Sequence, residues 1–423
     1  MRVSVFTPTN GPRYLGECHR SLMSQTADDW EWVLVPNGPA ATIPAEIAAD
    51  PRVKIHPLPA GAPAGGIGHL KRFACSRASG DLLVELDHDD LLAPRALERL
   101  AFHALESGAG FLYSDFAQFR PDKSSHTFDG RYGWEGYPTT LDGDAYTAMA
   151  AFEPCPASLA DLSYAPNHVR AWTRAAYIRA GGHDQALAVA DDLDLVCRTW
   201  RAGIEFRRIP ECLYWYREHS DPMGKNTYLT HPRLAELRQA VSNKHTYPVL
   251  AEWCRRRGLL RVDVGCGAAK PEGFVGVDAR PLPGVDVVHD VRRGLPFDEG
   301  SVGQLRVQDF LEHLRPGREI VNFMREAYRV LAPGGWLTAA VPSTDGRGAW
   351  QDPTHVSGWN RNSWWYYTDS HFRDYVDGLD VRFQLTRQWD DHPSPWHTQH
   401  GIGYTHADLA CLKGQRQPGE CRV

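Results

Sequence analysis

Residues 81–90 read DLLVELDHDD, an apolar run that ends in three aspartates. The apolar part has the length and the aliphatic content of a buried strand. Asp87, Asp89 and Asp90 then fall within four positions, where their like charges repel, so a cation is their natural partner. Oxygen ligands suit Mg²⁺ or Mn²⁺, which usually bridge to substrate phosphates. The alternative is a polar turn that caps the next helix, and the stretch alone supports both interpretations equally.

Around this stretch, short β-rich runs alternate with amphipathic helical runs from residue 2 to about residue 216. Such alternation predicts a mostly parallel sheet covered by helices, an α/β fold. The predicted strands are residues 2–6, 31–35, 52–58, 81–86 and 110–114. The predicted helices are residues 14–25, 66–79, 93–107, 171–180 and 191–202.

Residues 115–163 interrupt the alternation, because they are rich in Gly, Asp, Tyr and Pro and have poor periodicity. A loop of this length in a compact domain is usually functional or mobile, and we expect the same here.

The alternation restarts after a long helical pattern over residues 232–257, which ends in three arginines followed by Gly258. Basic residues and then glycine are typical of a helix C-terminus. The new predicted strands are residues 259–264, 274–277, 286–289, 304–308 and 336–341. We therefore predict two separate α/β domains, residues 1–228 and 258–412, a helical linker over 229–257 and a flexible tail over 413–423.

Composition narrows the class of protein. The 423 residues include 46 Lys and Arg against 52 Asp and Glu, a net charge of −6, which argues against a surface built for polyanions. Nine cysteines without a Cys-x-x-Cys pair indicate a reducing compartment and no structural zinc. The sequence has no apolar run of about 18 residues and no signal-peptide pattern at its start. These features predict a soluble, cytoplasmic protein without a transmembrane segment.

An ordered series of motifs accompanies the aspartate run. The series comprises VSVFTPTN at residues 3–10, WVLVPNG at 32–38, Lys71-Arg72, GGHD at 181–184, ADDLDL at 190–195 and YREH at 216–219. It resembles the inverting family-two glycosyltransferases, which have the GT-A nucleotide-diphospho-sugar transferase fold. The resemblance covers about 215 residues.

The resemblance implies a site for a nucleotide-sugar donor and a divalent metal, Mg²⁺ or Mn²⁺. Asp87 and Asp89 match the pair of aspartates that holds the metal and the diphosphate, and His219 matches a late histidine that completes this site. The donor-binding residues would be Thr7, Pro8, Asn10, Asn37, Lys71 and Arg72, together with Asp87. Asn37 stands where the family usually has an aspartate that reads uracil or ribose, so the base of the nucleotide stays open.

The resemblance also implies a catalytic base. Asp191-Asp192 replaces the family's Glu-Asp pair, and Asp192 matches the base, with Asp191 beside it. An attacking hydroxyl must lose its proton to a carboxylate on the acceptor side. Capping of the helix that follows is the structural alternative for the same two residues, and both roles are compatible.

The second half carries its own series: LRVDVGCG at residues 260–267, VGVD at 275–278, VHD at 288–290, DFLEHL at 309–314 and RVLAPGGWL at 329–337. It resembles the class I S-adenosylmethionine-dependent methyltransferases, which have a Rossmann-like fold. The resemblance implies that Asp278 holds the ribose of S-adenosylmethionine and that Asp290 lies at its adenine. Asp263, Gly265 and Gly267 would form the first cofactor motif.

The step from Gly267 to Asp278 is only 11 residues, too short for the usual helix between them. We therefore expect a shortened domain with a more open cofactor pocket. A dinucleotide dehydrogenase is disfavoured, because it needs Gly-x-Gly-x-x-Gly, a helix, and about 20 residues before the acidic residue.

His355 follows in QDPTH, residues 351–355, within a region rich in Trp and Tyr. It is a candidate base for O-methylation, and a loop-fixing histidine is at least as good an explanation. The aromatic residues suit a sugar acceptor or an ordinary core.

Together the two series predict a bifunctional enzyme that transfers a sugar to a glycan, a lipid-linked or another hydroxyl acceptor and then methylates. One alternative is an active glycosyltransferase with a degenerate methyltransferase-like scaffold or docking domain. The other is a glycosyltransferase that acts on modified nucleic acid, which the net charge of −6 disfavours.

Overall fold

The computed structural model describes residues 1–38, 41–59, 66–120, 122–126, 133–161, 165–219 and 231–414. The chain divides into two compact units. The first unit comprises residues 1–130, 134–154 and 158–249, and the second comprises residues 131–133, 155–157 and 250–423. Most of the predicted flexible tail, residues 415–423, lies outside the described residues.

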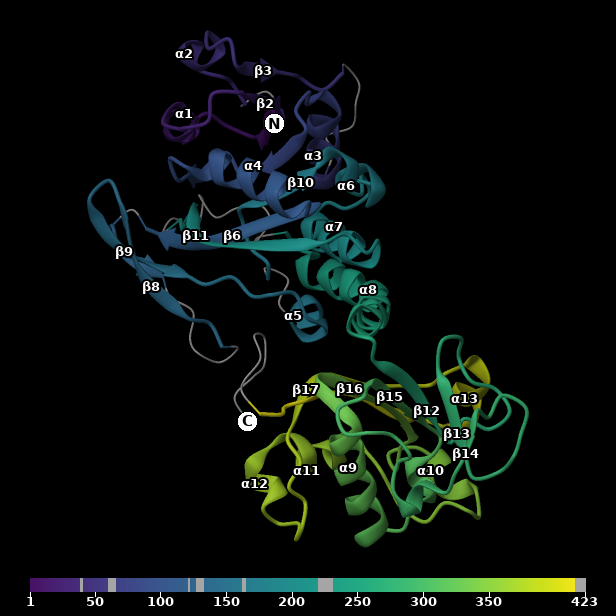
Figure 1. Cartoon of the computed structure of the whole chain (residues 1–423). Helices are drawn as coiled ribbons and strands as arrows, with labels where there is room; N and C mark the ends of the chain where they lie inside the picture. Colours follow the sequence, from purple (N-terminus) through teal and green to yellow (C-terminus); the bar gives the residue numbers. More distant parts are fainter. Residues whose placement is uncertain are drawn as a thin grey trace. The chain divides into compact units, whose positions relative to one another are not determined.

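The first unit is built on one mixed sheet in the order β3-β2-β1-β4-β10-β6-β11-β5, and β7 and β9 also pair with β6 (Figure 1). Its strands are β1 (Val3–Thr9), β2 (Trp30–Pro36), β3 (Val53–Ile55), β4 (Leu82–Glu85), β5 (Leu91–Leu92), β6 (Phe111–Phe119), β7 (Ser125–His126), β8 (Gly136–Leu141), β9 (Asp144–Met149), β10 (Arg170–Thr173) and β11 (Phe206–Arg217). Its helices are α1 (Leu15–Met23), α2 (Ala45–Ala48), α3 (Ile67–Arg77), α4 (Ala96–Ser107), α5 (Pro156–Asp161), α6 (Arg174–Arg179) and α7 (Asp191–Arg201).

The predicted parallel arrangement holds for β3, β2, β1 and β4, and β11 runs parallel to β6. β10 lies between β4 and β6 and runs antiparallel to both. The prediction of one helix over residues 171–180 is therefore wrong in its first part. Residues 170–173 form β10, and only 174–179 are helical, because pairing with two buried strands outweighs the helical propensity of this alanine-rich segment.

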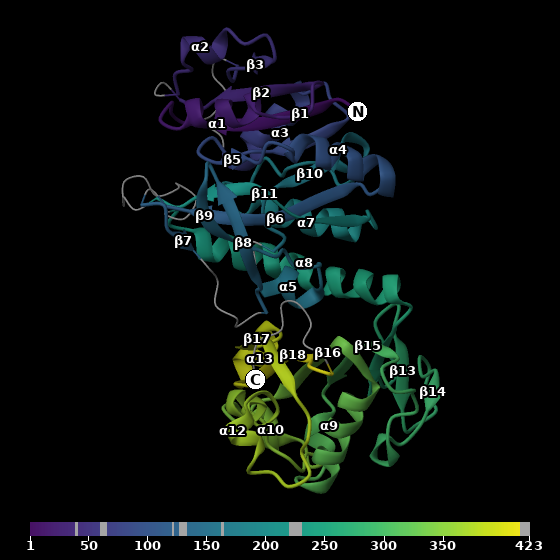
Figure 2. The ribbon, with the colours of Figure 1, turned by 60° about the vertical axis from the view of Figure 1, so that its left-hand side comes forward.

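The prediction of an irregular loop over residues 115–163 is also wrong. β6 continues to Phe119, and β8 and β9 form a hairpin whose two turn residues are Asp142 and Gly143 (Figure 2). Both turn residues have positive φ, 51° and 87°, which is the geometry that favours Asp-Gly in two-residue hairpin turns. The Asp142-Gly143 pair is therefore the feature of the sequence from which this hairpin could have been predicted.

α8 (Leu234–Arg257) runs from the first unit into the second and matches the helix predicted over 232–257. The two units divide within it, between Val249 and Leu250.

The second unit has a seven-stranded sheet in the order β14-β13-β12-β15-β16-β18-β17. The first five strands are parallel, and β18 runs antiparallel to β16 and β17. The strands are β12 (Leu260–Val264), β13 (Val275–Asp278), β14 (Val287–Val288), β15 (Val302–Gln308), β16 (Leu331–Pro342), β17 (Phe383–Asp391) and β18 (Tyr404–Cys411). The helices are α9 (Arg318–Val330), α10 (Gly348–Gln351), α11 (Trp365–Thr368), α12 (Ser370–Arg373) and α13 (Pro395–His400), with short 3-10 turns η2 (Val291–Arg293), η3 (Leu311–His313) and η4 (Arg361–Trp364).

The core of the second unit lies between this sheet and the apolar face of α9, the green helix of Figure 1. Phe323, Met324, Ala327 and Val330 of that helix pack with the buried aliphatic residues of the central strands. No helix joins β12 to β13, as the short spacing predicted. Among the described helices, none has both the length and the apolar character needed to cross a membrane.

Candidate functional site

The carboxyl ends of β1, β2 and β4 lie next to one another in the first unit, because these strands are parallel neighbours. Such an edge is the usual ligand-binding edge of an α/β sheet. Asn10 follows β1 and is exposed, and Asn37 follows β2 and is partly exposed. The backbone amide of Asn37 donates a hydrogen bond to the Thr9 carbonyl over 2.8 Å, which joins the ends of β1 and β2.

Thr7 and Pro8, also predicted to bind the donor, lie inside β1 and are buried. The Thr7 hydroxyl donates to the Leu86 carbonyl over 2.7 Å and accepts from Trp32 Nε1 over 2.9 Å. Thr7 thus joins β1, β2 and the end of β4. Of the predicted first donor-binding loop, only Asn10 is exposed.

The three aspartates after β4 have different surroundings. Asp90 is buried and accepts hydrogen bonds from the Tyr214 hydroxyl and the Arg217 amide, each over 2.7 Å. Burial and the neighbouring Asp89 charge raise the pKa of Asp90 well above its ordinary value. Asp89 pairs with His219 instead, with 2.7 Å between Oδ2 and Nε2. Burial opposes ionisation of Asp89, but the hydrogen bond with His219 keeps its pKa below the ordinary value.

Asp87 belongs to a second group that the sequence did not predict. His168 Nε2 lies 3.6 Å from Glu85 Oε1 and 3.8 Å from Asp87 Oδ2. These three residues form one of the two groups of metal-ligating side chains found among the described residues. The structure therefore places Asp89 with His219 and Asp87 with Glu85 and His168, and it does not gather Asp87, Asp89 and His219 into one such group.

Asp191 and Asp192 open α7, as predicted, and differ in exposure. The side chain of Asp192 is 15% exposed, whereas that of Asp191 is 1% exposed. Asp192 Oδ2 accepts from Arg170 Nη1 over 2.8 Å, and Asp192 Oδ1 accepts from the Leu193 amide over 2.8 Å. Burial raises the pKa of Asp192, but Arg170 and Lys71 outweigh burial and hold it below its ordinary value. The accessible carboxylate of the pair is thus ionised and fixed in orientation.

Lys71 occupies the interior of this site and does not face solvent. Its ammonium lies 2.5 Å from Glu85 Oε1 and 3.5 Å from Asp191 Oδ2. Burial raises the pKa of Asp191 to about 7, Lys71 opposes that shift, and Asp192 adds to it. Arg170 Nη1 lies 3.7 Å from Glu85 Oε2, so Lys71 and Arg170 together offset two of the three negative charges that Glu85, Asp191 and Asp192 would carry.

Arg72, the other predicted donor-binding cation, contacts backbone. Its Nη1 donates to the carbonyls of Gly181 and His183 and so fixes the turn before α7. His183 is fully buried and hydrogen-bonds the Tyr177 hydroxyl through Nδ1 over 2.9 Å. Burial lowers the pKa of His183 to about 3, so this histidine is neutral.

In the second unit, Gly265 and Gly267 form the turn after β12 with φ of 69° and 57°. The Gly267 amide donates to Asp278 Oδ2 over 3.0 Å, so the structure joins the predicted first motif to the predicted ribose-binding residue. A Cβ at Gly265 would lie 2.6 Å from the Phe310 ring, so a side chain is excluded there.

The other two predicted cofactor residues have side-chain partners within the unit. Asp263 Oδ1 pairs with Arg306 over 2.7 Å, while Oδ2 is buried with no hydrogen-bond partner among the described residues. Asp290 pairs with Arg292 over 2.8 Å and caps η2. The structure connects Gly267 with Asp278 directly, and no such contact joins Asp290 to them among the described residues.

His355 contacts its own loop and a buried carboxylate. Its Nδ1 lies 2.8 Å from the Ala349 carbonyl, and its Nε2 lies 3.9 Å from Glu312 Oε1. Glu312 was not singled out from the sequence, although it lies in the quoted DFLEHL motif.

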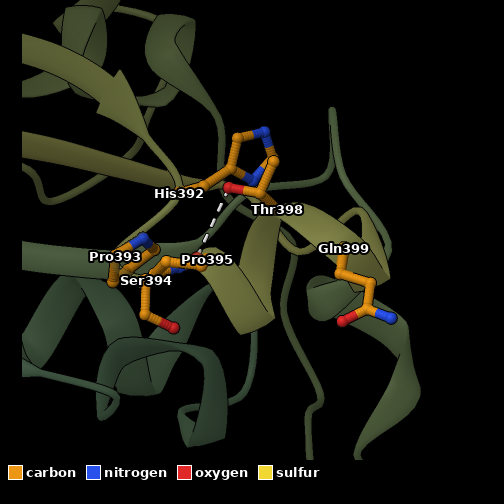
Figure 3. Close-up of a pocket in the computed structure, with 6 residues that line it drawn as sticks. All are labelled: His392, Pro393, Ser394, Pro395, Thr398 and Gln399. Carbon is orange, nitrogen blue, oxygen red and sulfur yellow. Dashed lines mark hydrogen bonds between the residues drawn. The ribbon is translucent and has the colours of Figure 1, made fainter.

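A surface pocket of about 610 Å³ also occurs in the second unit (Figure 3). His392, Pro393, Ser394, Pro395, Thr398 and Gln399 line it. None of these residues belongs to either predicted site.

Comparisons with known proteins find one family match in each half of the chain. Residues 4–158 match the family model for glycosyl transferase family 2, and residues 262–339 match the model for a methyltransferase domain. The O-antigen biosynthesis protein RfbC of Myxococcus xanthus is 27% identical over 226 residues, which are 52% of this chain and 16% of that protein. The chain thus spans less than a fifth of that relative's length.

Solved structures with similarity to the chain include TarS residues 1–349 of S. aureus. That structure has a TM-score of 0.40 and 16% identity and covers 60% of this chain and 72% of its own. The mannosyltransferase PcManGT from Pyrobaculum calidifontis, solved with GDP-Man and Mn²⁺, has a TM-score of 0.38 and 17% identity. It covers 60% of this chain and 64% of its own.

Proposed function

Since the chain joins a family 2 glycosyltransferase domain to a methyltransferase domain, we propose that it is a bifunctional enzyme. The first unit would transfer a sugar from a nucleotide-sugar donor to an acceptor hydroxyl with inversion, and the second would methylate the product. The observation that carries the first activity is the accessible carboxylate of Asp192, held ionised beside the ligand-binding edge of the sheet.

For a divalent cation of the Mg²⁺ or Mn²⁺ type, the first unit offers Asp89 and His219 as a pair of candidate ligands, while Asp87 lies with Glu85 and His168. Asp89 and His219 are already in contact, and the carboxylate of Asp87 is 26% exposed nearby in sequence. Carboxylates with one imidazole suit Mn²⁺, and carboxylates alone suit Mg²⁺. When bound, such an ion neutralises the charge that develops on the leaving diphosphate. Asn10 and Asn37, which follow β1 and β2, would contact the nucleoside.

Asp192 would act as the base. The acceptor hydroxyl attacks the anomeric carbon from the face opposite the diphosphate, and its proton passes to the carboxylate. Arg170 and the Leu193 amide hold both oxygens of Asp192 in one orientation. Asp191, whose pKa is raised to about 7 and whose side chain is 1% exposed, would support the network without touching the acceptor.

The metal requirement is tested with the full chain and a panel of nucleotide sugars. We expect turnover that stops in excess chelator, returns with Mn²⁺ or Mg²⁺, and is abolished by Asp89→Ala while the circular dichroism spectrum is unchanged. Asp28→Ala, an exposed aspartate before β2, is the matched control. Full activity of Asp89→Ala, or full activity in chelator, would contradict the metal site.

The proposed methylation activity is supported by the hydrogen bond from the backbone amide of Gly267 to the Asp278 carboxylate. S-adenosylmethionine, when bound, supplies the methyl group. Asp278 would hold the ribose hydroxyls through a charge-assisted bidentate contact, and Asp263, whose buried Oδ2 has no partner among the described residues, would complete the first motif with Gly265. Calorimetry of S-adenosylmethionine with the full chain tests this. Absence of binding would favour the alternative of a degenerate scaffold or docking domain.

For the acceptor, we propose a glycan or a lipid-linked glycan, because RfbC is named for O-antigen biosynthesis. Nucleic acid is the competing class. Binding to nucleic acid weakens steeply as salt rises, since phosphate contacts release counterions. Acceptor binding that is insensitive to salt would therefore support the glycan, and a steep salt dependence would support nucleic acid.

A further inference from the structure

Three metal-ligating side chains meet in the second unit, outside the predicted cofactor turn. Glu312 and His313 lie in η3, after β15, and His355 lies in the segment after α10. One ligand atom from each lies within 4.8 Å of the other two. The two segments are joined by backbone, because the amides of Val356 and Ser357 donate to the Glu312 carbonyl over 2.8 and 3.1 Å.

Glu312 is the unusual member of this group. It is 1% exposed, and neither carboxylate oxygen has a hydrogen-bond partner with normal geometry among the described residues. A buried carboxylate without a partner is costly, and proteins normally pair such a group or use it to coordinate a metal. The nearest potential cation is His355, whose Nε2 is 3.9 Å from Glu312 Oε1, beyond hydrogen-bond distance.

The two histidines are oriented by their other ring nitrogen. His355 Nδ1 lies 2.8 Å from the Ala349 carbonyl, which fixes a proton on Nδ1 and leaves the lone pair on Nε2, facing Glu312. His313 Nδ1 lies 3.3 Å from the Thr354 carbonyl, which favours the same tautomer. Metal-binding histidines characteristically use this arrangement, in which a carbonyl oxygen accepts from the nitrogen that does not bind the metal.

We propose that Glu312, His313 and His355 bind one divalent transition-metal ion of the zinc type. Two imidazoles and one carboxylate are a ligand set of zinc sites that keep a fourth position open. His313 is exposed, so this site borders solvent and the fourth position is accessible to an oxygen ligand.

The position of the group points to an oxygen of the acceptor as that fourth ligand. Phe310, two residues before Glu312, packs over Gly265 of the cofactor turn. Trp350, next to Ala349, is 63% exposed and offers an aromatic face for a sugar ring. This assignment of the ligand rests on the proposed methyl transfer, whereas the metal site itself does not.

The test is metal binding by the full chain, measured apart from any activity. Chelator-treated protein is titrated with Zn²⁺ by calorimetry and with Co²⁺ by visible absorption. We expect Glu312→Gln and His355→Gln to weaken binding at this site at least tenfold. Glu319→Gln, at a partly exposed position, and His371→Gln, at an exposed one, lie outside the group; they are the matched controls and should leave Zn²⁺ binding unchanged.

Two further variants keep the result interpretable. His313→Gln alters only an exposed side chain, so its loss of binding cannot be ascribed to damage of the core. Asp89→Ala removes the proposed metal site of the first unit and should retain the Zn²⁺ binding that Glu312→Gln loses. Equal Zn²⁺ binding by wild type, Glu312→Gln and His313→Gln would overturn the proposal, as would loss of all binding in Asp89→Ala alone. S-adenosylmethionine binding is measured on the same samples, so failure of the cofactor site is seen separately.

Discussion

Both carboxylate oxygens of Asp192 accept hydrogen bonds, one from the Arg170 guanidinium and one from the Leu193 backbone amide. Asp192→Asn keeps the volume, but its single oxygen can accept from only one of these two donors, and its amide group cannot accept the proton of an attacking hydroxyl. We expect unchanged donor affinity by calorimetry and a transfer rate lower by about 100-fold or more.

The matched control for this variant is Asp191→Asn, because Asp191 is the buried member of the pair. It should retain measurable transfer and should change the free energy of unfolding instead, since it touches the Lys71 network. Near-normal transfer by Asp192→Asn together with loss in Asp191→Asn would assign the base to Asp191.

Asp50 provides a prediction about pH and stability. Hydrogen bonds from the Arg52 side chain lower its pKa to about 2, from 3.8, against a smaller opposing effect of burial. Because the folded pKa is depressed, the stabilisation is fully present above the unfolded pKa and is lost as pH falls through the folded pKa. Asp50→Asn should cost about 2 kcal/mol near pH 7, and the difference from wild type should shrink between about pH 4 and pH 2. Denaturant titrations across that range measure the difference, and a difference independent of pH would assign the cost to packing.

At the scale of elements, the sequence predicted the positions of strands best where the strand is a continuous apolar run. β1, β2 and β4 and the five parallel strands of the second unit all lie at predicted positions. It failed where strands are short or have mixed composition. β10 has four residues and is held by its two neighbours, and β17 mixes apolar residues with uncharged polar and charged ones at the edge of its sheet. Those strands exist because of partners distant in sequence, which local periodicity does not report.

The N-terminal turn of α3 is a close packing contact between two elements. The Gly68 amide donates to the Leu187 carbonyl over 3.2 Å, and a Cβ at Gly68 would clash with the Asp184 carbonyl oxygen and lie 3.0 Å from that of Leu187. Gly68→Ala should therefore push α3 away from the segment before α7 and lower the free energy of unfolding by about 1–3 kcal/mol. Transfer should fall with it, since Lys71 of α3 contacts Asp191.

Gly16→Ala is the control for this helix glycine. Gly16 lies in α1, and a Cβ there would meet only Arg20 at 3.7 Å. The substitution should raise stability by about 0.5 kcal/mol, because alanine favours the helix. A stability of Gly68→Ala equal to that of wild type would show that the α3 contact is not tight.

At the scale of the whole molecule, the motifs predicted a family 2 glycosyltransferase match in the first half and a methyltransferase match in the second, but not the side chains that contact the predicted site residues. Asp192 and Asp278 could be named from local motifs. Arg170 lies 22 residues from Asp192, and His168 lies in no recognisable motif. Glu312 and His355 are 43 residues apart, and only the fold brings them together. Local motifs indicate candidate ligand-binding residues, whereas the contacts that hold those residues depend on tertiary structure.

The two sheets share no strand among the described residues, and each site is built from its own sheet. Asp278→Ala should therefore weaken S-adenosylmethionine binding by roughly 10- to 150-fold, the equivalent of about 1.5–3 kcal/mol for a charged hydrogen-bond partner. Nucleotide-sugar affinity should stay the same. Calorimetry with each ligand measures both, and parallel losses would indicate that the variant has damaged the fold beyond the second unit.

The direct connection from β12 to β13 has an electrostatic consequence. In dinucleotide-binding folds, a helix begins at the glycine turn, and the partial positive charge at its N-terminus stabilises the pyrophosphate. In the continuously described residues 231–414, no helix lies between this turn and β13. A pyrophosphate there would meet the Asp278 carboxylate without the charge of a helix N-terminus, and the neighbouring cation, Arg280, already pairs with Asp278 at 3.5 Å. We therefore expect this turn to disfavour diphosphate-bearing nucleotides, such as sugar-nucleotide donors, by charge.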